Sequence, residues 1–392
     1  MNDACIYLDH AATTPVDPRV LDAMLPFFSE RYGNPSSVYD LGRDARAGLD
    51  WARETLAHLL NCQSSEIIMT SGATEANNAA IKGVAWGRRL QGEQPGGHIV
   101  ISAIEHPSVL QAAGSLDLHG FEMTHVLPDK DGIVAPDAVA AALRPDTCLI
   151  SVMLASNEIG TIQPLQDIAR VARERGIAMH TDAVQAAGAL PLDVDLLGVD
   201  LLTLSAHKFY GPKGVGALYA RQGVPLAWQQ HGGGQENTRR GGTENVALIV
   251  GMATALALAY HELEERVAHT RTLRDRLIDE LLERVPDARL NGHAERRLPN
   301  NVNLTFGGVD GEPLLLSLDM LGIAASSGSA CSTGSMEPSH VLRAIGLDDG
   351  MARGSLRLTV GKDNTRDEID RAIESIASVI ARIRALTAAG YA

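Results

Sequence analysis

A lysine at the end of an apolar run is the residue of this chain whose chemistry is most readily defined. The run 201–204 predicts a short buried strand, and Ser205, His207 and Lys208 follow it before a glycine- and proline-containing turn at 211–214. Burial and nearby positive charge favour a neutral amine, and a neutral amine forms a Schiff base with an aldehyde. Taken alone, Lys208 is better explained as a surface lysine at a strand end, so its interpretation depends on the residues that the fold brings near it.

Polar or small residues follow four other apolar runs. They are Ser71 to Thr74 after 67–70, His106 after 98–102, Asn157 after 148–154, and Asp182 and Gln185 after 176–180. Each has an ordinary explanation as a helix cap or turn residue. However, short apolar runs that alternate with helical patterns predict an α/β fold with a mostly parallel sheet, whose carboxyl strand ends lie at one edge.

Together these strand ends would supply a helix start for a phosphate, an imidazole, an amide, a carboxylate, a glutamine and a lysine. A pyridine ring that carries an aldehyde, a hydroxyl and a phosphate requires this set, and pyridoxal phosphate fits it. A nicotinamide or a flavin would leave Lys208 unexplained, and no G-x-G-x-x-G motif follows the first strand.

A second segment with chemical potential is the loop 325–335, in which small polar residues surround Cys331. Because nothing in the loop can bury the thiol, Cys331 could reach a substrate and then a partner protein, and an incidental free cysteine is the alternative. Arg357 lies on a predicted strand, where it could clamp a substrate carboxylate or form a salt bridge. The other three cysteines are expected to be inert, buried thiols: Cys5, Cys62 and Cys148.

The length and the order of patterns predict three parts in this chain of 392 residues. An N-terminal arm (1–16) is expected to pack with a small C-terminal domain (261–392), which carries the cysteine loop. A large domain (17–260) contains the sheet, and the apolar run 246–260 is expected to be a core helix.

Composition restricts the classes of partner. The net charge of −14 argues against nonspecific binding to nucleic acid. No signal-peptide pattern and no apolar run long enough to cross a membrane is visible, and the scattered cysteines have no zinc-ligand spacing. We therefore expect a cytoplasmic protein with neither a membrane segment nor an intrinsic metal.

Several motifs resemble those of the cysteine desulfurases, which depend on pyridoxal phosphate, and the likeness covers nearly the whole chain. The motifs are SGATEANN (71–78), EHPSVL (from 105), NEIGTIQP (157–164), SAHKFYGPKG (205–214), GGTEN (241–245) and SSGSACSTGSMEPSHVLRA (326–344). The long cysteine loop is similar to that of the NifS/IscS type, within the class-V aminotransferases of fold type I. The resemblance implies a large domain with a mostly parallel seven-stranded sheet and a smaller α+β domain.

The resemblance also implies an activity and a set of partners. L-Cysteine would be converted to L-alanine, and its sulfur would be left as a persulfide on Cys331. A homodimer would pass this sulfur to an iron–sulfur scaffold or another acceptor, for cluster assembly or for tRNA thiolation. Cys331 could then make a transient contact with an iron–sulfur cluster.

Roles for individual residues follow from the same resemblance. Lys208 would carry the cofactor, Asp182 would hold a proton on its ring nitrogen, and His106 would stack on the ring and relay protons. Cys331 would be the nucleophile. The phosphate would be bound by Ala73, Thr74, Ser205, His207 and Thr243 of the partner subunit. The ring hydroxyl and the substrate would be bound by Gln185, Asn157, Arg357 and Asn34.

Two positions depart from the family pattern, and three other functions stay open. Gly241 stands where the family often has serine, and Tyr39 stands where it usually has histidine, which puts details of substrate approach in doubt. An aminotransferase would need no thiol, and a selenocysteine lyase would prefer selenium to sulfur. A non-catalytic relative would bind no cofactor, although the presence of Lys208, Asp182 and His106 argues against it.

Overall fold

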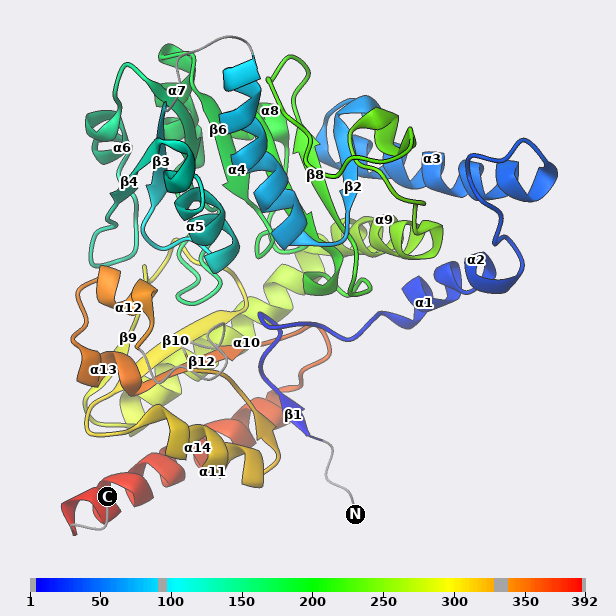
Figure 1. Cartoon of the computed structure of the whole chain (residues 1–392). Coiled ribbons are helices and arrows are strands. Elements are labelled where there is room, and N and C mark those ends of the chain that lie inside the picture. Colours follow the sequence, from blue (N-terminus) through cyan, green and yellow to red (C-terminus); the bar gives the residue numbers. More distant parts are fainter. Residues whose placement is uncertain (1–4, 91–96, 328–337, 390–392) are drawn as a thin grey trace.

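The computed structural model describes residues 5–90, 97–327 and 338–389. Cys331, the predicted nucleophile, lies outside the described residues. In Figure 1 a central sheet with helices on both sides forms the upper part of the molecule. A smaller group of strands and helices built from the C-terminal segments lies below it, and the N-terminal strand β1 (Ile6–Tyr7) joins this lower group.

The central sheet has seven strands and is mostly parallel, which confirms the predicted fold class. Their order across the sheet is β2 (Ile67–Thr70), β8 (Gly216–Ala220), β7 (Leu201–Ser205), β6 (Ala178–Asp182), β5 (Thr147–Ser151), β3 (Gly97–Ser102) and β4 (Phe121–Val126). Only β8 runs antiparallel to its neighbours. The sequence analysis did not predict β4, because this edge strand buries its two ends and carries exposed or half-buried residues between them.

Helices cover both faces of this sheet and bury two apolar layers. On one face lie α4 (Ala73–Leu90) and α5 (Pro107–Gly114). On the other lie α3 (Asp40–Leu60), α7 (Leu165–Glu174) and α9 (Val246–His261), with α6 (Pro136–Ala142) and α8 (Val194–Leu197) at the periphery. Ten residues of α9 are buried, so the expected core helix is confirmed.

A sharp bend links the sheet to the lower group of elements. The helical pattern 246–284 predicts a break near 260–264, and the structure has it at Glu262, where α9 meets α10 (Leu263–Arg284) at an angle of 74°. By length and composition, no single helix in the described part of the chain could cross a membrane, and this bent pair alone passes such a test.

The lower group has its own sheets and its own core. Strands β9 (Ala288–Leu290), β10 (Asn301–Phe306) and β12 (Ser355–Thr359) form an antiparallel sheet, and β1 pairs with β11 (Ile323–Ala324). The helices are α11 (Gly311–Met320), α12 (His340–Ala344), α13 (Asp349–Arg353) and α14 (Arg366–Ala388). Ile6 and Leu8 of the arm share the core of this group. We keep the predicted boundaries 1–16, 17–260 and 261–392 as a proposal.

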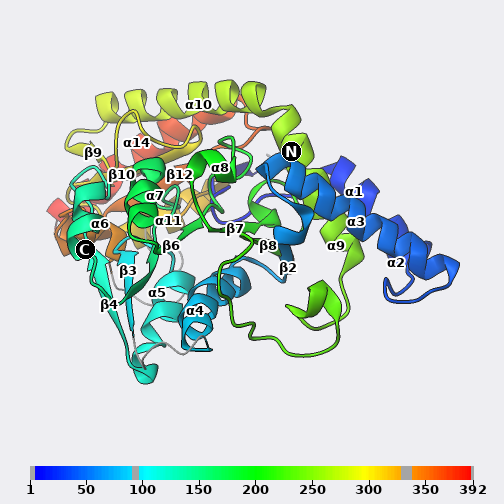
Figure 2. The same cartoon turned by 90° about the horizontal axis from the view of Figure 1, so that it is seen from above.

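One further part of the chain extends sideways. Helices α1 (Pro18–Met24) and α2 (Pro26–Ser29) and the first turns of α3 project to one side of the molecule in both Figure 1 and Figure 2. Many of their large apolar side chains are exposed: Leu21, Leu25, Phe28, Tyr32, Val38, Tyr39, Leu41 and Trp51. We call these eight residues the N-terminal apolar patch.

Candidate active site

A cavity of about 590 Å³ lies at the carboxyl ends of the parallel strands. This volume is within the range of pockets that hold a cofactor or a small substrate. Ten of the predicted site residues line it: Ala73, Thr74, His106, Asn157, Asp182, Gln185, Ser205, His207, Lys208 and Arg357. They come from both the large sheet and β12, so residues far apart in the sequence converge on one space.

Lys208 is held by the backbone of the N-terminal arm. Its Nζ donates hydrogen bonds to the carbonyl oxygens of Ala11 (2.6 Å) and Ala12 (2.7 Å), and Gln185 Nε2 donates to Ala11 O (3.0 Å). The arm was expected to pack with the small domain, and its contact with Lys208 was missed. No signal in the sequence could have shown it, because the acceptors are backbone atoms of two alanines.

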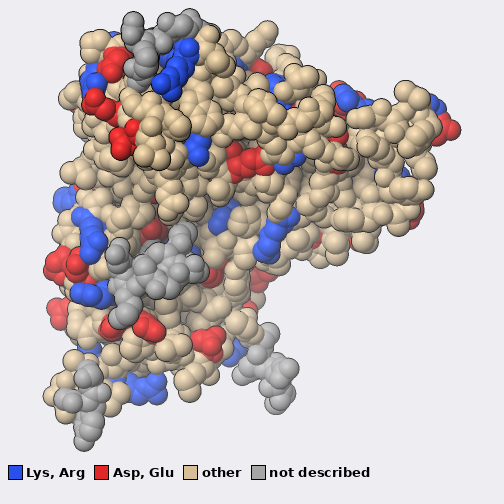
Figure 3. Space-filling model, viewed as in Figure 1, with Lys and Arg blue, Asp and Glu red and all other residues tan. Residues whose placement is uncertain are grey.

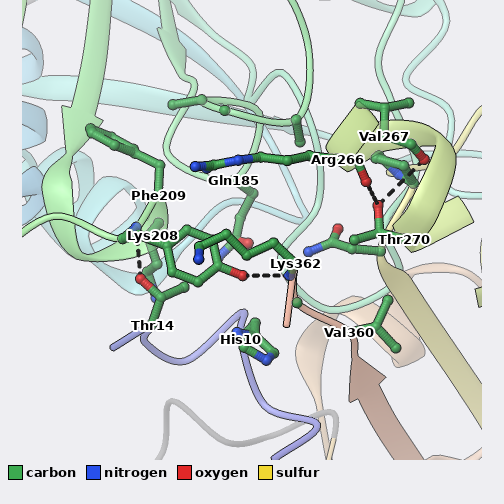
Figure 4. A pocket seen from close by; sticks show the side chains of 17 residues that line it. His10, Thr14, Gln185, Lys208, Phe209, Arg266, Val267, Thr270, Val360 and Lys362 are labelled. Carbon is green, nitrogen blue, oxygen red and sulfur yellow. Dashed lines mark hydrogen bonds between the residues drawn. The ribbon is translucent and has the colours of Figure 1, made fainter. Parts of the chain in front are cut away.

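A second cavity lies beside the same lysine (Figure 4). Lys208 and Gln185 line both cavities, and His10, Tyr210 and Lys362 line the second one. Its volume is about 50 Å³, so it has room for water and not for a cofactor. The larger cavity is therefore the candidate active site.

Asp182 and His106 are joined through two buried residues that the sequence analysis did not single out. Asn77 Nδ2 donates to Asp182 Oδ2 (2.8 Å) and to Ser108 Oγ (2.8 Å). Ser108 Oγ in turn lies 2.8 Å from His106 Nδ1. His106 is also the N-cap of α5, with Nδ1 accepting from Ser108 N (3.1 Å), and Asp182 Oδ1 accepts from Val184 N (3.0 Å). The ordinary capping and turn roles are thus present together with the convergence on the cavity.

The expected phosphate end of the cavity is built from the start of α4. The helical pattern of the sequence predicts a helix start at Glu75, after the small residues 71–74. The helix begins two residues earlier, at Ala73, so the N–H groups of Ala73 and Thr74 lie in its first turn. Gly72 has a φ of 152°, and a side chain there would meet no atom within 4 Å, which leaves the backbone open. Burial lowers the pKa of His207 to about 4, with further lowering by Lys208 and Lys213.

Arg357 is almost fully buried and already has an acidic partner. Its Nη2 lies 2.8 Å from Asp9 Oδ1, and its Nη1 donates to Asn157 O (3.2 Å). The alternative of a salt bridge is therefore observed. The buried Nε has no hydrogen-bond partner among the residues that the structure describes.

Two predicted site residues lie elsewhere in the single chain. Asn34 and Thr243 line a separate surface pocket together with Phe28 and Tyr32 of the N-terminal apolar patch. Neither lines the 590 Å³ cavity of the same chain. Both could act in an active site only if a second chain brings them there, as was expected for Thr243 and not for Asn34.

The residues on either side of the cysteine loop are tied to the neighbourhood of the cavity. Ser326 Oγ donates to Asp9 Oδ2 (2.8 Å), the carboxylate that pairs with Arg357. His340 Nε2 lies 3.0 Å from the carbonyl oxygen of Glu105, the residue before His106. Ser339, the N-cap of α12, donates to the buried carboxylate of Glu158.

The three other cysteines differ in exposure. Cys148 is buried, as expected, and Cys62 is half-buried. Burial raises the pKa of Cys62 to about 12, which makes its thiol unreactive. The expectation was wrong for Cys5, which lies next to β1 and is exposed.

Glu105 leads to a prediction about stability and pH. Burial raises its pKa to about 8 from an ordinary 4.5, so the folded protein keeps it neutral where the unfolded chain ionises it. The free energy of unfolding therefore receives from Glu105 a contribution that falls as the pH rises from 4.5 to 8. We expect Glu105→Gln to remove this contribution, so that the variant gains up to a few kcal/mol over the wild type between pH 5 and pH 8.

Urea denaturation of both proteins at pH 5, 6.5 and 8 measures this difference. Glu122→Gln, at an exposed carboxylate, is the matched control and should follow the wild type. Equal pH dependence in Glu105→Gln and the wild type would contradict the assignment of a neutral Glu105.

Comparison with known proteins agrees with this geometry. The family model for class-V aminotransferases matches residues 6–372. The cysteine desulfurase IscS of Dictyoglomus turgidum is 48% identical over 382 residues, which cover 97% of this chain and 96% of the relative. A NifS-like protein of known structure superimposes with a TM-score of 0.90 at 38% identity, covering 96% of this chain and 100% of the other.

A further solved structure, of SspA in complex with cysteine, has a TM-score of 0.80 and 38% identity, covering 92% of this chain and 100% of the other. The family model and the IscS relative each span almost the entire chain. The chain therefore belongs to the class-V aminotransferase family and, within it, to the cysteine desulfurases.

Proposed function

We propose that this protein converts L-cysteine to L-alanine and keeps the sulfur as a persulfide on Cys331. The convergence of ten predicted residues on one cavity is the observation that carries the proposal. The reaction balances without an added oxidant: L-cysteine and the Cys331 thiol become L-alanine and the Cys331 persulfide. A carbon–sulfur bond breaks, a sulfur–sulfur bond forms, and a proton replaces sulfur on the substrate β-carbon.

The family depends on pyridoxal phosphate, and the residues around the cavity fit this cofactor. A helix start with an open glycine before it suits the phosphate, and the buried carboxylate of Asp182 suits a protonated ring nitrogen. When bound, pyridoxal phosphate supplies an aldehyde for amines and a ring that accepts the electrons left by a departing α-proton. We infer that Ala73, Thr74, Ser205, His207 and the partner subunit's Thr243 hold the phosphate, and that Gln185 addresses the ring hydroxyl.

The protein's own groups then divide the work on the substrate. Lys208 Nζ would hold the cofactor and would take up the proton from the α-carbon of the substrate. His106 would stack on the cofactor ring and relay protons, while Arg357 and Asn157 would hold the substrate carboxylate side. Cys331 Sγ attacks the substrate sulfur as a thiolate.

We infer that the functional unit is a homodimer. The N-terminal apolar patch is large and exposed, and it adjoins the surface pocket that contains Asn34 and Thr243. A second copy seated on the patch would cover it and would bring Thr243 to the neighbouring active site. Asn34 is proposed to reach substrate in the same way.

Mixing two inactive variants tests this arrangement. We expect Lys208→Ala and Thr243→Ala chains, unfolded and refolded together, to regain activity, because each mixed dimer has one site with both residues intact. Each variant refolded alone is the control. If the mixture is no more active than the sum of its parts, Thr243 acts within its own chain or not at all.

The acceptor of the sulfur would be an iron–sulfur scaffold or a related protein, and tRNA thiolation would be a second use of the sulfur. Cys331 could make a transient contact with an iron–sulfur cluster. We place the protein in the cytoplasm and expect no direct contact with nucleic acid. The net charge of −14 supports the latter, and the face in Figure 3 carries basic and acidic side chains in small mixed groups.

The activity itself is tested by feeding L-cysteine to the purified protein, with and without a reductant. We expect alanine with and without the reductant. Without the reductant, one sulfur atom should stay bound for each Cys331, and with the reductant the sulfur should be released as sulfide. Pyruvate or a keto acid in place of alanine would contradict the proposal. A strong preference for L-selenocysteine would instead identify a selenocysteine lyase.

A further inference from the structure

A buried series of hydrogen bonds connects two residues that line the proposed cofactor site. It runs from Asp182 at the end of β6, through Asn77 on α4 and Ser108 on α5, to His106 at the N-cap of α5. Asn77 is fully buried, and Ser108 is 8% exposed. Polar groups at such depth are costly unless their hydrogen bonds are made in one defined arrangement.

The positions of the hydrogens along this series follow from donor and acceptor chemistry. Asn77 Nδ2 lies 2.8 Å from Asp182 Oδ2 and 2.8 Å from Ser108 Oγ, so both of its hydrogens are used. The opposite orientation of the amide would point its oxygen at the carboxylate and would be repelled. Ser108 Oγ therefore accepts from Asn77 and donates its own hydrogen to His106 Nδ1, 2.8 Å away.

A second donor reaches the same ring nitrogen. The backbone N–H of Ser108 also points at His106 Nδ1, at 3.1 Å. A nitrogen that accepts two hydrogen bonds carries no hydrogen of its own, so the imidazole proton must be on Nε2. Protonation to imidazolium would place a hydrogen on Nδ1 against both donors.

We propose that Asn77 and Ser108 are positioning residues, which hold His106 as the neutral tautomer with its proton on Nε2 and fix the Asp182 carboxylate. This inference rests on the proposed function, because the purpose of the arrangement is to keep a neutral ring over the cofactor. A cation at this position would oppose the protonated ring nitrogen that Asp182 is proposed to stabilise.

Most of the surroundings of His106 also favour its neutral form. Burial lowers the pKa of His106, as do Lys208 from the turn after β7 and His340 from α12, whereas Asp182 from β6 raises it. Glu105, adjacent in sequence, is itself held neutral by burial. The hydrogen-bond geometry thus acts in the same direction as the surroundings.

Nitrogen NMR of the histidine-labelled holoenzyme tests the proposal, with His106 identified by the signal lost in His106→Asn. In the wild type at neutral pH we expect the Nδ1 shift of an unprotonated nitrogen, and we expect His106 to titrate below the ordinary range of a histidine. Ser108→Ala removes one of the two donors, so the pKa of His106 should rise by about half to one unit. Ser108→Thr keeps the hydroxyl and should restore the wild-type behaviour.

Asn77→Ala should also change the pKa of His106, measured in the same way. Asn78→Ala is its matched control. Asn78 is the next residue of α4, is only half-buried, and donates to Thr74 O within its own helix. We also expect kcat for cysteine to fall about five- to tenfold in Ser108→Ala, with KM within about twofold of the wild type.

Two results would overturn the proposal: a proton on Nδ1 of His106 in the wild type, or an unchanged titration in Ser108→Ala. If Asn77→Ala fails to fold, the Ser108 pair of variants decides the matter alone. Because the NMR result does not depend on which reaction is catalysed, it separates this inference from the proposed desulfurase activity.

Discussion

Lys208→Ala is expected to reduce the formation of alanine from L-cysteine by a factor of about 10⁴ or more. In the structure the amine of Lys208 lies between the carbonyl oxygens of Ala11 and Ala12 at the edge of the cavity, with Asp182 and His106 among the other lining residues. The loss is large because the same amine is proposed both to bind the cofactor and to remove the α-proton. The variant should also lose the visible absorption that the wild type shows with its cofactor.

Borohydride reduction followed by peptide mapping provides the direct measurement. The wild type should carry the reduced cofactor on Lys208, and Lys208→Ala should carry none. Lys213→Ala is the matched control, since Lys213 lines the same cavity and the label should stay on Lys208. A label on Lys213 or on any other lysine of the wild type would refute the assigned site and the mechanism built on it.

Cys331→Ala is expected to prevent accumulation of protein-bound sulfur and to lower alanine formation by about 10³-fold or more, because no other thiol is placed to take the sulfur. The described residues on both sides of the loop support this. Ser326 is linked through Asp9 to Arg357, and His340 is linked to the backbone of Glu105.

Cys5→Ala serves as the control, because Cys5 is the exposed cysteine of the described chain and should make no difference to sulfur transfer. Mass spectrometry of the protein after one turnover should find an added sulfur atom on the peptide that contains Cys331. An undiminished rate of alanine formation in Cys331→Ala would point instead to an enzyme that needs no thiol, such as an aminotransferase.

Much of the fold and most of the cavity could be predicted from local sequence patterns. The apolar runs before Thr74, His106, Asp182 and Lys208 correspond to strands of the sheet, and the carboxyl ends of parallel strands meet at one edge whatever the details of packing. The polar edge strand β4 escaped prediction because its burial is confined to its ends. The start of α4 at Ala73 was missed because the small residues at 71–74 show no helical spacing of apolar side chains.

Contacts between distant segments could not be predicted in this way. Asp9 and Arg357 are 348 residues apart, and Asn77 and Asp182 are 105 residues apart. Their pairing depends on how the arm, the sheet and the small domain pack together. The same is true of Asn34 and Thr243. Only the structure shows that both residues lie away from the cavity, together in one surface pocket.

The amino-acid sequence by itself determined which chemical groups are available and in which order the strands present them, because periodicity and turn chemistry are local properties of the chain. Only the tertiary structure decided which backbone atoms hold Lys208, which side chains contact His106 and Asp182, and which predicted residues lie away from the cavity. These features come from long-range packing and from hydrogen bonds between buried polar groups far apart in the chain, and neither can be deduced from any single stretch of sequence.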